Sequence, residues 1–416
     1  MKPFITASIV VLSLLGGALT HPGEHHDEEF VKRGIAAREL AGAHAHQVVN
    51  KCAGTAVHST LQARAAARRA LTAQLLREER DIVHKSLKSK RQENAINKWM
   101  GECHDQTSVY HGTLNASSTE TAIFTSNATH ALTPESIVGP YFVAGELVRK
   151  NITEGQAGVP VHLDMQFLDI NTCQPIPNML IDVWHANATG VYSGVVGSGG
   201  LNTTFLRGFQ VTDHDGVVEF DTLYPGHYFG RTQHIHVMSR LGGKILANGT
   251  YTGGTVNHIG QLYFDQELSG VIEAMEPYAS NWLPVTYNSD DFLTAQAASD
   301  DYDPFPDYVM LSEDANDGLL MWITIGINTT ADYDNQAWAA ATWRKGGGVA
   351  APMPTFPFPL NGTLNGTTNG TFPPMPMGGP GFPGGFPGMP TASAKGSKPT
   401  PKPWGACEKK QRLGTK

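Results

Sequence analysis

Two histidines in a predicted strand, His234 and His236, have a spacing that suits metal binding. In a strand both side chains point to the same face, two rises of roughly 3.3 Å apart, so both imidazoles can reach one metal ion. A second pair, His44 and His46, lies in a region of helical composition, where this spacing makes the side chains diverge. The pattern also occurs in strands that bind nothing, so the pair needs further ligands to support a metal site.

Two tyrosines supply such ligands. Tyr228 precedes His234 across a glycine-containing turn, and Tyr192 follows a glycine-containing loop after another predicted strand. A tyrosine ionises near pH 10 in water, so it becomes a phenolate ligand at neutral pH only beside a strong Lewis acid. Two phenolates and two imidazoles form a hard, anionic set that suits ferric iron, whereas zinc more commonly takes thiolate or carboxylate ligands.

Strands must bring these residues together. From 161 to 167 apolar and polar residues alternate, which is the period of a half-buried strand. Further predicted strands are 179–184, 209–211, 217–220, 234–238, 261–264 and 320–327. Turn sequences separate several of them, and helical patterns do not intervene. We therefore expect a mainly β fold, an antiparallel β-sandwich, over residues 132–345.

A helical segment and connector are predicted before this domain, over 34–131. From 34 to about 100 the chain is rich in Ala, Leu, Arg, Lys and Gln and contains no proline, which favours helix. Between 61 and 91 nine residues are basic and three are acidic, which predicts a positive, solvent-exposed helix face. The alternative is that this face binds acidic cell-wall polymer or an oligomer partner.

Both ends of the chain indicate a secreted protein. Residues 1–20 have the form of a signal peptide, and ten Asn-x-Ser/Thr sequons suit the same compartment. The dibasic pair Lys32-Arg33 marks either the end of a propeptide over 21–33 or an exposed basic pair. Residues 346–416 are rich in Gly and Pro and predict a disordered, glycosylated tail. A transmembrane span is not expected, because the N-terminal apolar run is too short.

The four cysteines allow three pairings in an oxidising compartment. We favour Cys52 with Cys103, because both border the same helical segment. A formal net charge of −8 gives no general attraction to nucleic acid. With 45 glycines, 26 prolines and only 16% charged residues, the composition also argues against a coiled coil.

From about 132 to 327 the chain resembles the intradiol ring-cleavage dioxygenases, particularly the secreted fungal members. Residues 133–142 (TPESIVGPYF) match the family's entry motif, and 183–187 (VWHAN) with Tyr192 match its tryptophan-containing strand and ligand loop. The family's second ligand tyrosine matches Tyr228, and its arginine before the first ligand histidine matches Arg231. Its His-x-His pair matches His234 and His236, and its Gln-Leu-Tyr-Phe strand matches residues 261–264.

The resemblance implies a nonheme Fe(III) centre that binds a catechol through both oxygens and uses O2 to cleave the ring between them, giving a muconate-type diacid. The implied ligands are Tyr192, Tyr228, His234 and His236. Tyr228 would leave the metal and act as base, Arg231 would stabilise negative charge, and Gln261 would orient the substrate. The simpler alternatives are a surface ion pair for Arg231 and a sheet hydrogen bond for Gln261.

The sequence departs from the family at three places. Thr232-Gln233 replaces a Pro-Ala pair, the interval between Tyr228 and His234 is short, and a glycine-rich insertion with Asn248 precedes Gln261. Asn187 is also a sequon close to Tyr192, so a glycan there would either border the active site or be excluded by burial.

Two other functions remain open from the sequence. One is a noncatalytic secreted β-sandwich that binds glycan or cell wall. The other is copper chemistry at a mature N-terminal His21. Assembly into a homo-oligomer is open as well, as is the identity of the aromatic substrate.

Overall fold

The structure is a computed structural model that describes residues 52, 55–82, 104–106, 124, 136, 138–297, 303–344 and 347–351. The expected signal peptide, the propeptide over 21–33, His21, Cys103 and the chain beyond 351 lie outside the described residues. In the part that the structure describes, none of the helices combines the length and apolar character needed to cross a membrane.

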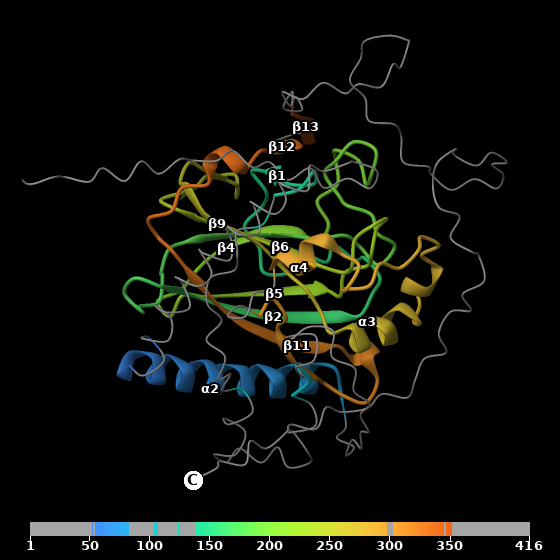
Figure 1. Cartoon of the computed structure of the whole chain (residues 1–416), viewed down its shortest axis with the longest axis horizontal. Coiled ribbons are helices and arrows are strands. Elements are labelled where there is room, and N and C mark those ends of the chain that lie inside the picture. Colours follow the sequence, from blue (N-terminus) through green and yellow to red (C-terminus); the bar gives the residue numbers. More distant parts are fainter. Residues whose placement is uncertain are drawn as a thin grey trace, which may run out of the picture.

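Two four-stranded sheets stack face to face (Figure 1). The first has the order β10 (Asp307–Met310), β11 (Leu319–Ile327), β2 (Pro160–Asp169), β5 (Val217–Leu223). The second has the order β4 (Arg207–Val211), β3 (Leu180–Trp184), β6 (Ile235–Leu241), β9 (Thr255–Leu262). The mainly β prediction is confirmed. The pairing differs from a purely antiparallel sandwich at one place, because β11 runs parallel to β2.

The main hydrophobic core lies between the two sheets. On β2 it takes alternate residues from Val161 to Phe167, and across from them lie Val183 of β3 and Val237 of β6. These side chains are at most 2% exposed. Each fully buried side chain of this size stabilises the fold by about 1.5–3 kcal/mol, so the core fixes the register of the strands that carry the site.

The polar residues of β2 are also buried, so the half-buried prediction is wrong. His162, Asp164 and Gln166 are at most 2% exposed. The reason is helix α2 (Ala56–Glu79), which lies along the outer side of the first sheet (Figure 1). An alternating pattern indicates which residues share a face, but it does not tell whether a second layer covers the polar face.

Helix α2 also overturns the prediction of a solvent-exposed basic face. Arg69 is 0% exposed and donates to Asp164 at 3.1 Å, and Arg68 donates to the same carboxylate at 2.7 and 3.0 Å. Arg77 is 4% exposed and donates to the Leu311 carbonyl at 2.8 Å. Arg68, Arg69 and Arg77 therefore point towards the sheet, which offers a carboxylate and carbonyl oxygens, whereas the Arg64 side chain is 48% exposed. The basic residues of the predicted face beyond 82 lie outside the described residues.

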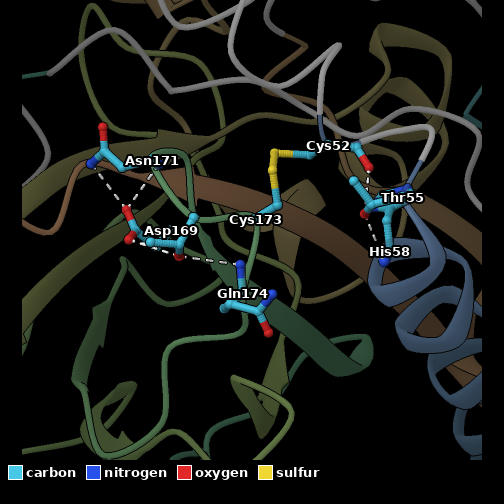
Figure 2. Close-up of a disulfide and its surroundings, with 8 residues drawn as sticks. Cys52, Thr55, His58, Asp169, Asn171, Cys173 and Gln174 are labelled. Carbon is cyan, nitrogen blue, oxygen red and sulfur yellow. Dashed lines mark hydrogen bonds between the residues drawn. A yellow bond between two sulfur atoms is a disulfide. The ribbon is translucent and has the colours of Figure 1, made fainter.

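The disulfide joins Cys52 to Cys173, so the predicted pairing of Cys52 with Cys103 is wrong (Figure 2). Cys173 lies in the tight turn that follows β2, where the Asp169 carboxylate accepts hydrogen bonds from Asn171. Because α2 crosses the sheet, Cys52, which precedes the helix, reaches this distant turn, with a Cα–Cα distance of 5.2 Å between the two cysteines.

A small sheet of β1 (Val143–Ala144), β12 (Ala341–Arg344) and β13 (Gly347–Ala350) closes one end of the fold. Strand β13 pairs with β12, so residues 347–350 belong to a sheet and the predicted tail begins later than 346. The remaining elements are β7 (Lys244–Ile245), β8 (Tyr251–Thr252), α3 (Gln266–Glu273), η2 (Tyr278–Ser280), α4 (Phe292–Ala297), η3 (Ala315–Asp317) and η4 (Asp334–Gln336).

Candidate metal centre and active site

The site lies on the face of the second sheet that points away from the main core. Trp184 of β3 is the register partner of His236 on β6, which in turn is the partner of Gln261 on β9. Their neighbours Val183 and Val237 enter the core, so this row points to the opposite side. The rings of Trp184 and His236 stack with centroids 4.7 Å apart and planes 5° apart. This stacking fixes the orientation of the imidazole.

The structure brings the four predicted ligands together. The Tyr192 hydroxyl lies 3.4 Å from Nε2 of His234. The ring centroids of His234 and His236 are 4.9 Å apart, and that of Tyr228 lies 5.5 Å from both Tyr192 and His234. Tyr192, His234 and His236 are at most 2% exposed. Two phenols and two imidazoles thus meet in one buried volume.

The two imidazoles have different partners. Nδ1 of His234 donates to the Thr232 carbonyl at 2.7 Å, so its Nε2 carries the lone pair on the side of Tyr192. Both ring nitrogens of His236 are buried without a hydrogen-bond partner among the described residues. Buried polar atoms are normally hydrogen-bonded, so an unsatisfied imidazole beside two phenols fits a metal ligand.

Burial determines the protonation of these groups. It lowers the pKa of His234 and His236 well below the ordinary value, and Arg231 adds to this effect, so both rings are neutral. It raises the pKa of Tyr192 well above its ordinary value and also raises that of Tyr228. The imidazoles are therefore ready to bind a metal, while the phenols ionise only when a Lewis acid is present.

The ligand types are informative as well. Among the described residues, no group of three or more His, Cys, Asp or Glu side chains could hold a metal ion. The donor set of Tyr192, Tyr228, His234 and His236, which includes two phenol oxygens, fits a hard, highly charged cation such as Fe(III).

Arg231 connects the candidate ligand Tyr228 to Gln261 and Asp291. Its guanidinium donates to the Tyr228 hydroxyl at 3.3 Å, to Gln261 Oε1 at 2.6 Å and to the Asp291 carboxylate at 2.8 Å. Burial opposes the charge, but the Tyr228 phenol and Asp291 raise the pKa of Arg231 above its ordinary value. Arg231 is 8% exposed, so the surface ion pair is wrong, and the Gln261 side chain contacts the site.

Sequence reasoning missed three residues of the site. Tyr141 stacks on Tyr192 with ring centroids 4.2 Å apart, and Arg207 lies 5.8 Å over the same ring. Tyr141 belongs to the 133–142 motif, which could have marked it. Asp291 had no such signal, because it reaches Arg231 from the loop before α4.

Comparison with known proteins agrees with this geometry. A dioxygenase family model, Dioxygenase_C, matches residues 137–243. Catechol 1,2-dioxygenase 1 of Acinetobacter lwoffii is 32% identical over 27% of this chain and 39% of its own length. Catechol 1,2-dioxygenase of Acinetobacter baylyi is 30% identical over 23% of this chain and 32% of its own length. The chain thus spans less than half the length of these relatives.

Among solved structures, an intradiol ring-cleavage dioxygenase from Tetranychus urticae is 30% identical, with a TM-score of 0.43, over 49% of this chain and 97% of its own. The family-model match includes all four candidate ligands. Residues 137–243 therefore match the dioxygenase family model, and about a quarter of the chain is similar in sequence to catechol 1,2-dioxygenases.

Proposed function

We propose that this protein is a secreted, nonheme Fe(III) dioxygenase that cleaves catechol-type aromatics between their two hydroxyls to muconate-type acids. The observation that carries the proposal is the convergence of two phenols and two neutral imidazoles in one buried site, with both nitrogens of His236 unsatisfied. The ring-cleaving reactions of the relatives support the same chemistry for this chain.

Tyr192, Tyr228, His234 and His236 would hold the iron. Bound Fe(III) would act as a Lewis acid that lowers the pKa of a catechol hydroxyl and prepares the ring for reaction with O2. Tyr228 is only partly buried, whereas Tyr192 is 1% exposed. The Tyr228 phenol oxygen would therefore be the group that accepts a substrate proton.

Arg231 and Gln261 complete the site. The Arg231 guanidinium lies within 3.3 Å of the Tyr228 oxygen, so it stabilises negative charge on that oxygen and on a substrate that takes its place. Because Gln261 and Asp291 hold the guanidinium in place, this charge is fixed before substrate arrives. Tyr141 stacks on the Tyr192 ring and Trp184 stacks on the His236 ring, and these contacts would hold both candidate ligands in place.

The extracellular location is part of the proposal. The disulfide between Cys52 and Cys173 suits an oxidising compartment, and the sequon residues Asn151, Asn202 and Asn248 are exposed. The N-terminus of the secreted protein, read by mass spectrometry, tests the expected removal of residues 1–20 and of the 21–33 segment.

Oxygen uptake tests the activity directly. Iron-loaded protein should consume O2 with catechol or hydroxyquinol, bind about one iron per chain and absorb visible light through phenolate-to-iron charge transfer. The noncatalytic glycan-binding alternative predicts neither iron nor oxygen uptake. An iron-loaded protein that stays inactive across a panel of catechols would refute the proposed reaction.

A further inference from the structure

Four of the five sequon asparagines in the described chain share one local turn, and Asn202 is the exception. In Asn151, Asn187, Asn248 and Asn328, the side-chain oxygen accepts hydrogen bonds from both the amide and the hydroxyl of the threonine two residues later. This turn is a common local arrangement that suits a surface loop. By itself it indicates neither a glycan nor a role in the site.

Asn187 makes further contacts that the other three do not share. Its Oδ1 also accepts from the Val191 amide at 3.0 Å, and its Nδ2, the atom that would carry a glycan, donates to Gln156 Oε1 at 3.0 Å. The Asn187 amide donates to the Val191 carbonyl at 2.9 Å. Asn187 therefore holds both peptide groups of the residue that precedes the candidate ligand Tyr192.

The same residue reaches the second ligand loop. The Gly226 amide, two residues before Tyr228, donates to the Asn187 carbonyl at 3.2 Å. The two loops touch closely, because a Cβ on Gly190 would lie 2.3 Å from the His227 carbonyl oxygen. A Cβ on Gly226 would lie 2.2 Å from the Ala188 carbonyl oxygen. Glycine is therefore required on both sides of this contact.

We propose that Asn187 is a positioning residue that sets the Tyr192 loop against the Tyr228 loop, and that it serves this purpose in place of carrying a glycan. The inference rests on the proposed function, because Tyr192 and Tyr228 are its iron ligands. Asn187 touches neither the metal nor the substrate. It acts through the backbone that fixes the separation of the two phenol oxygens, as supporting contacts do around metal sites.

Two measurements on unglycosylated protein from a bacterial host test this role. Asn187→Ala should weaken iron affinity about tenfold or more and reduce the visible charge-transfer band, since loss of such supporting contacts typically weakens metal binding by about 10–100-fold. In the iron-free protein, amide hydrogen exchange of a peptide covering 187–192 should become faster, which needs neither iron nor activity.

The matched control is Asn248→Ala. It removes the same turn and a sequon from the loop between β7 and β8, so iron affinity, the band and exchange at 187–192 should stay as in the wild type. Asn187→Asp keeps an acceptor for Thr189 and Val191 and should restore most of the iron affinity. If Asn187→Ala behaves like Asn248→Ala in both measurements, the positioning role is wrong.

A second variant keeps the test decisive if Asn187→Ala does not fold. Gln156→Ala removes only the partner of Nδ2 and should still accelerate exchange at 187–192, and unchanged exchange overturns the proposal. If the wild-type protein binds no iron and shows no visible absorption, the proposed function is wrong. The hydrogen-exchange comparison still tests the positioning role of Asn187 in that case, because it needs no iron. In protein secreted by a eukaryotic host, glycopeptide analysis should find Asn187 unmodified, and a glycan there with normal iron binding contradicts the role.

Discussion

Arg231 places a positive charge against the candidate ligand Tyr228 and the side-chain amide of Gln261. Lysine would keep the charge but lose the planar fork that reaches Tyr228, Gln261 and Asp291 together. We expect Arg231→Lys to retain iron and to lower kcat about 100-fold, the usual loss for a donor that stabilises developing negative charge.

Steady-state oxygen uptake and iron analysis check this prediction. Tyr263→Phe is the comparison variant. It removes a 3.3 Å contact to the same guanidinium and a 2.9 Å hydrogen bond to Gln261 Oε1, but it leaves the bonds from Arg231 to Tyr228, Gln261 and Asp291 in place, so it should have a much smaller effect on kcat. An Arg231→Lys enzyme with wild-type kcat would show that the guanidinium geometry is unimportant.

Three phenols meet at the site, but only two are proposed as ligands. Tyr192→Phe should lose the charge-transfer band and most of the bound iron, because it removes a phenolate oxygen 3.4 Å from His234. Tyr141→Phe should keep both, since the ring still stacks on Tyr192. Absorption spectra and iron content of the two variants show which phenol binds the iron. Equal loss of colour in both would mean that Tyr141 is needed as much as Tyr192, which contradicts the prediction.

One of the contacts that attach helix α2 to the sandwich is a buried carboxylate. Asp164 is 1% exposed and accepts from both Arg68 and Arg69, so Asp164→Ala leaves the buried Arg69 guanidinium with the Phe124 carbonyl but without a carboxylate. We expect the free energy of unfolding to fall by about 3–5 kcal/mol. Urea denaturation followed by circular dichroism measures this change.

The control for this prediction is the neighbouring ion pair of Arg64 and Asp215. The Arg64 side chain is 48% exposed, so Asp215→Ala should cost less than about 1 kcal/mol. If the two variants lose the same stability, the buried pair does not hold the helix.

The disulfide attaches the start of α2 to the turn after β2. Its two cysteines are 121 residues apart, so it restricts a long loop of the unfolded chain. Cys52→Ser should lower the free energy of unfolding by about 2–5 kcal/mol under non-reducing conditions. Thermal melts with and without reductant test this. The reductant should lower the melting temperature of the wild type by breaking the Cys52–Cys173 disulfide, and the variant, which lacks this bond, should not show that part of the shift.

The stability of the whole molecule should depend on pH through His104. This buried imidazole lies between the carboxylates of Asp265, at 2.5 Å, and Asp303, at 2.8 Å. Burial opposes its charge, but the two carboxylates raise the pKa of His104 well above its ordinary value. A pKa that is higher in the folded state means that folding favours the protonated form.

The contribution of His104 is therefore fully present below the unfolded-state pKa of about 6.5 and is lost as the pH rises through the folded-state value. The stability difference between the wild type and His104→Asn should shrink as the pH is raised above about 6.5. Denaturation over a pH series measures it. His214→Asn, at a side chain that is 85% exposed, is the control, and an equal slope for both variants would contradict the prediction.

The sequence was sufficient for the features that depend on local periodicity. The period of two located β2, and short predicted strands, several of them separated by turn sequences, located β3, β4, β5, β6 and β11 to within a few residues. His234 lies one residue before β6, yet its ring still meets that of His236. Strand β9 was recognised only at its C-terminal end, because its first half, which begins at Thr255, follows a glycine-rich insertion that hides its start.

Only the tertiary structure decided the features that depend on contacts between distant segments. The polar face of β2 is buried because α2 crosses it, and this same crossing pairs Cys52 with Cys173. Asp291 reaches Arg231 from a loop sixty residues further along the chain. Local patterns reveal which side chains share a face, but the packing of one element on another determines what each face meets.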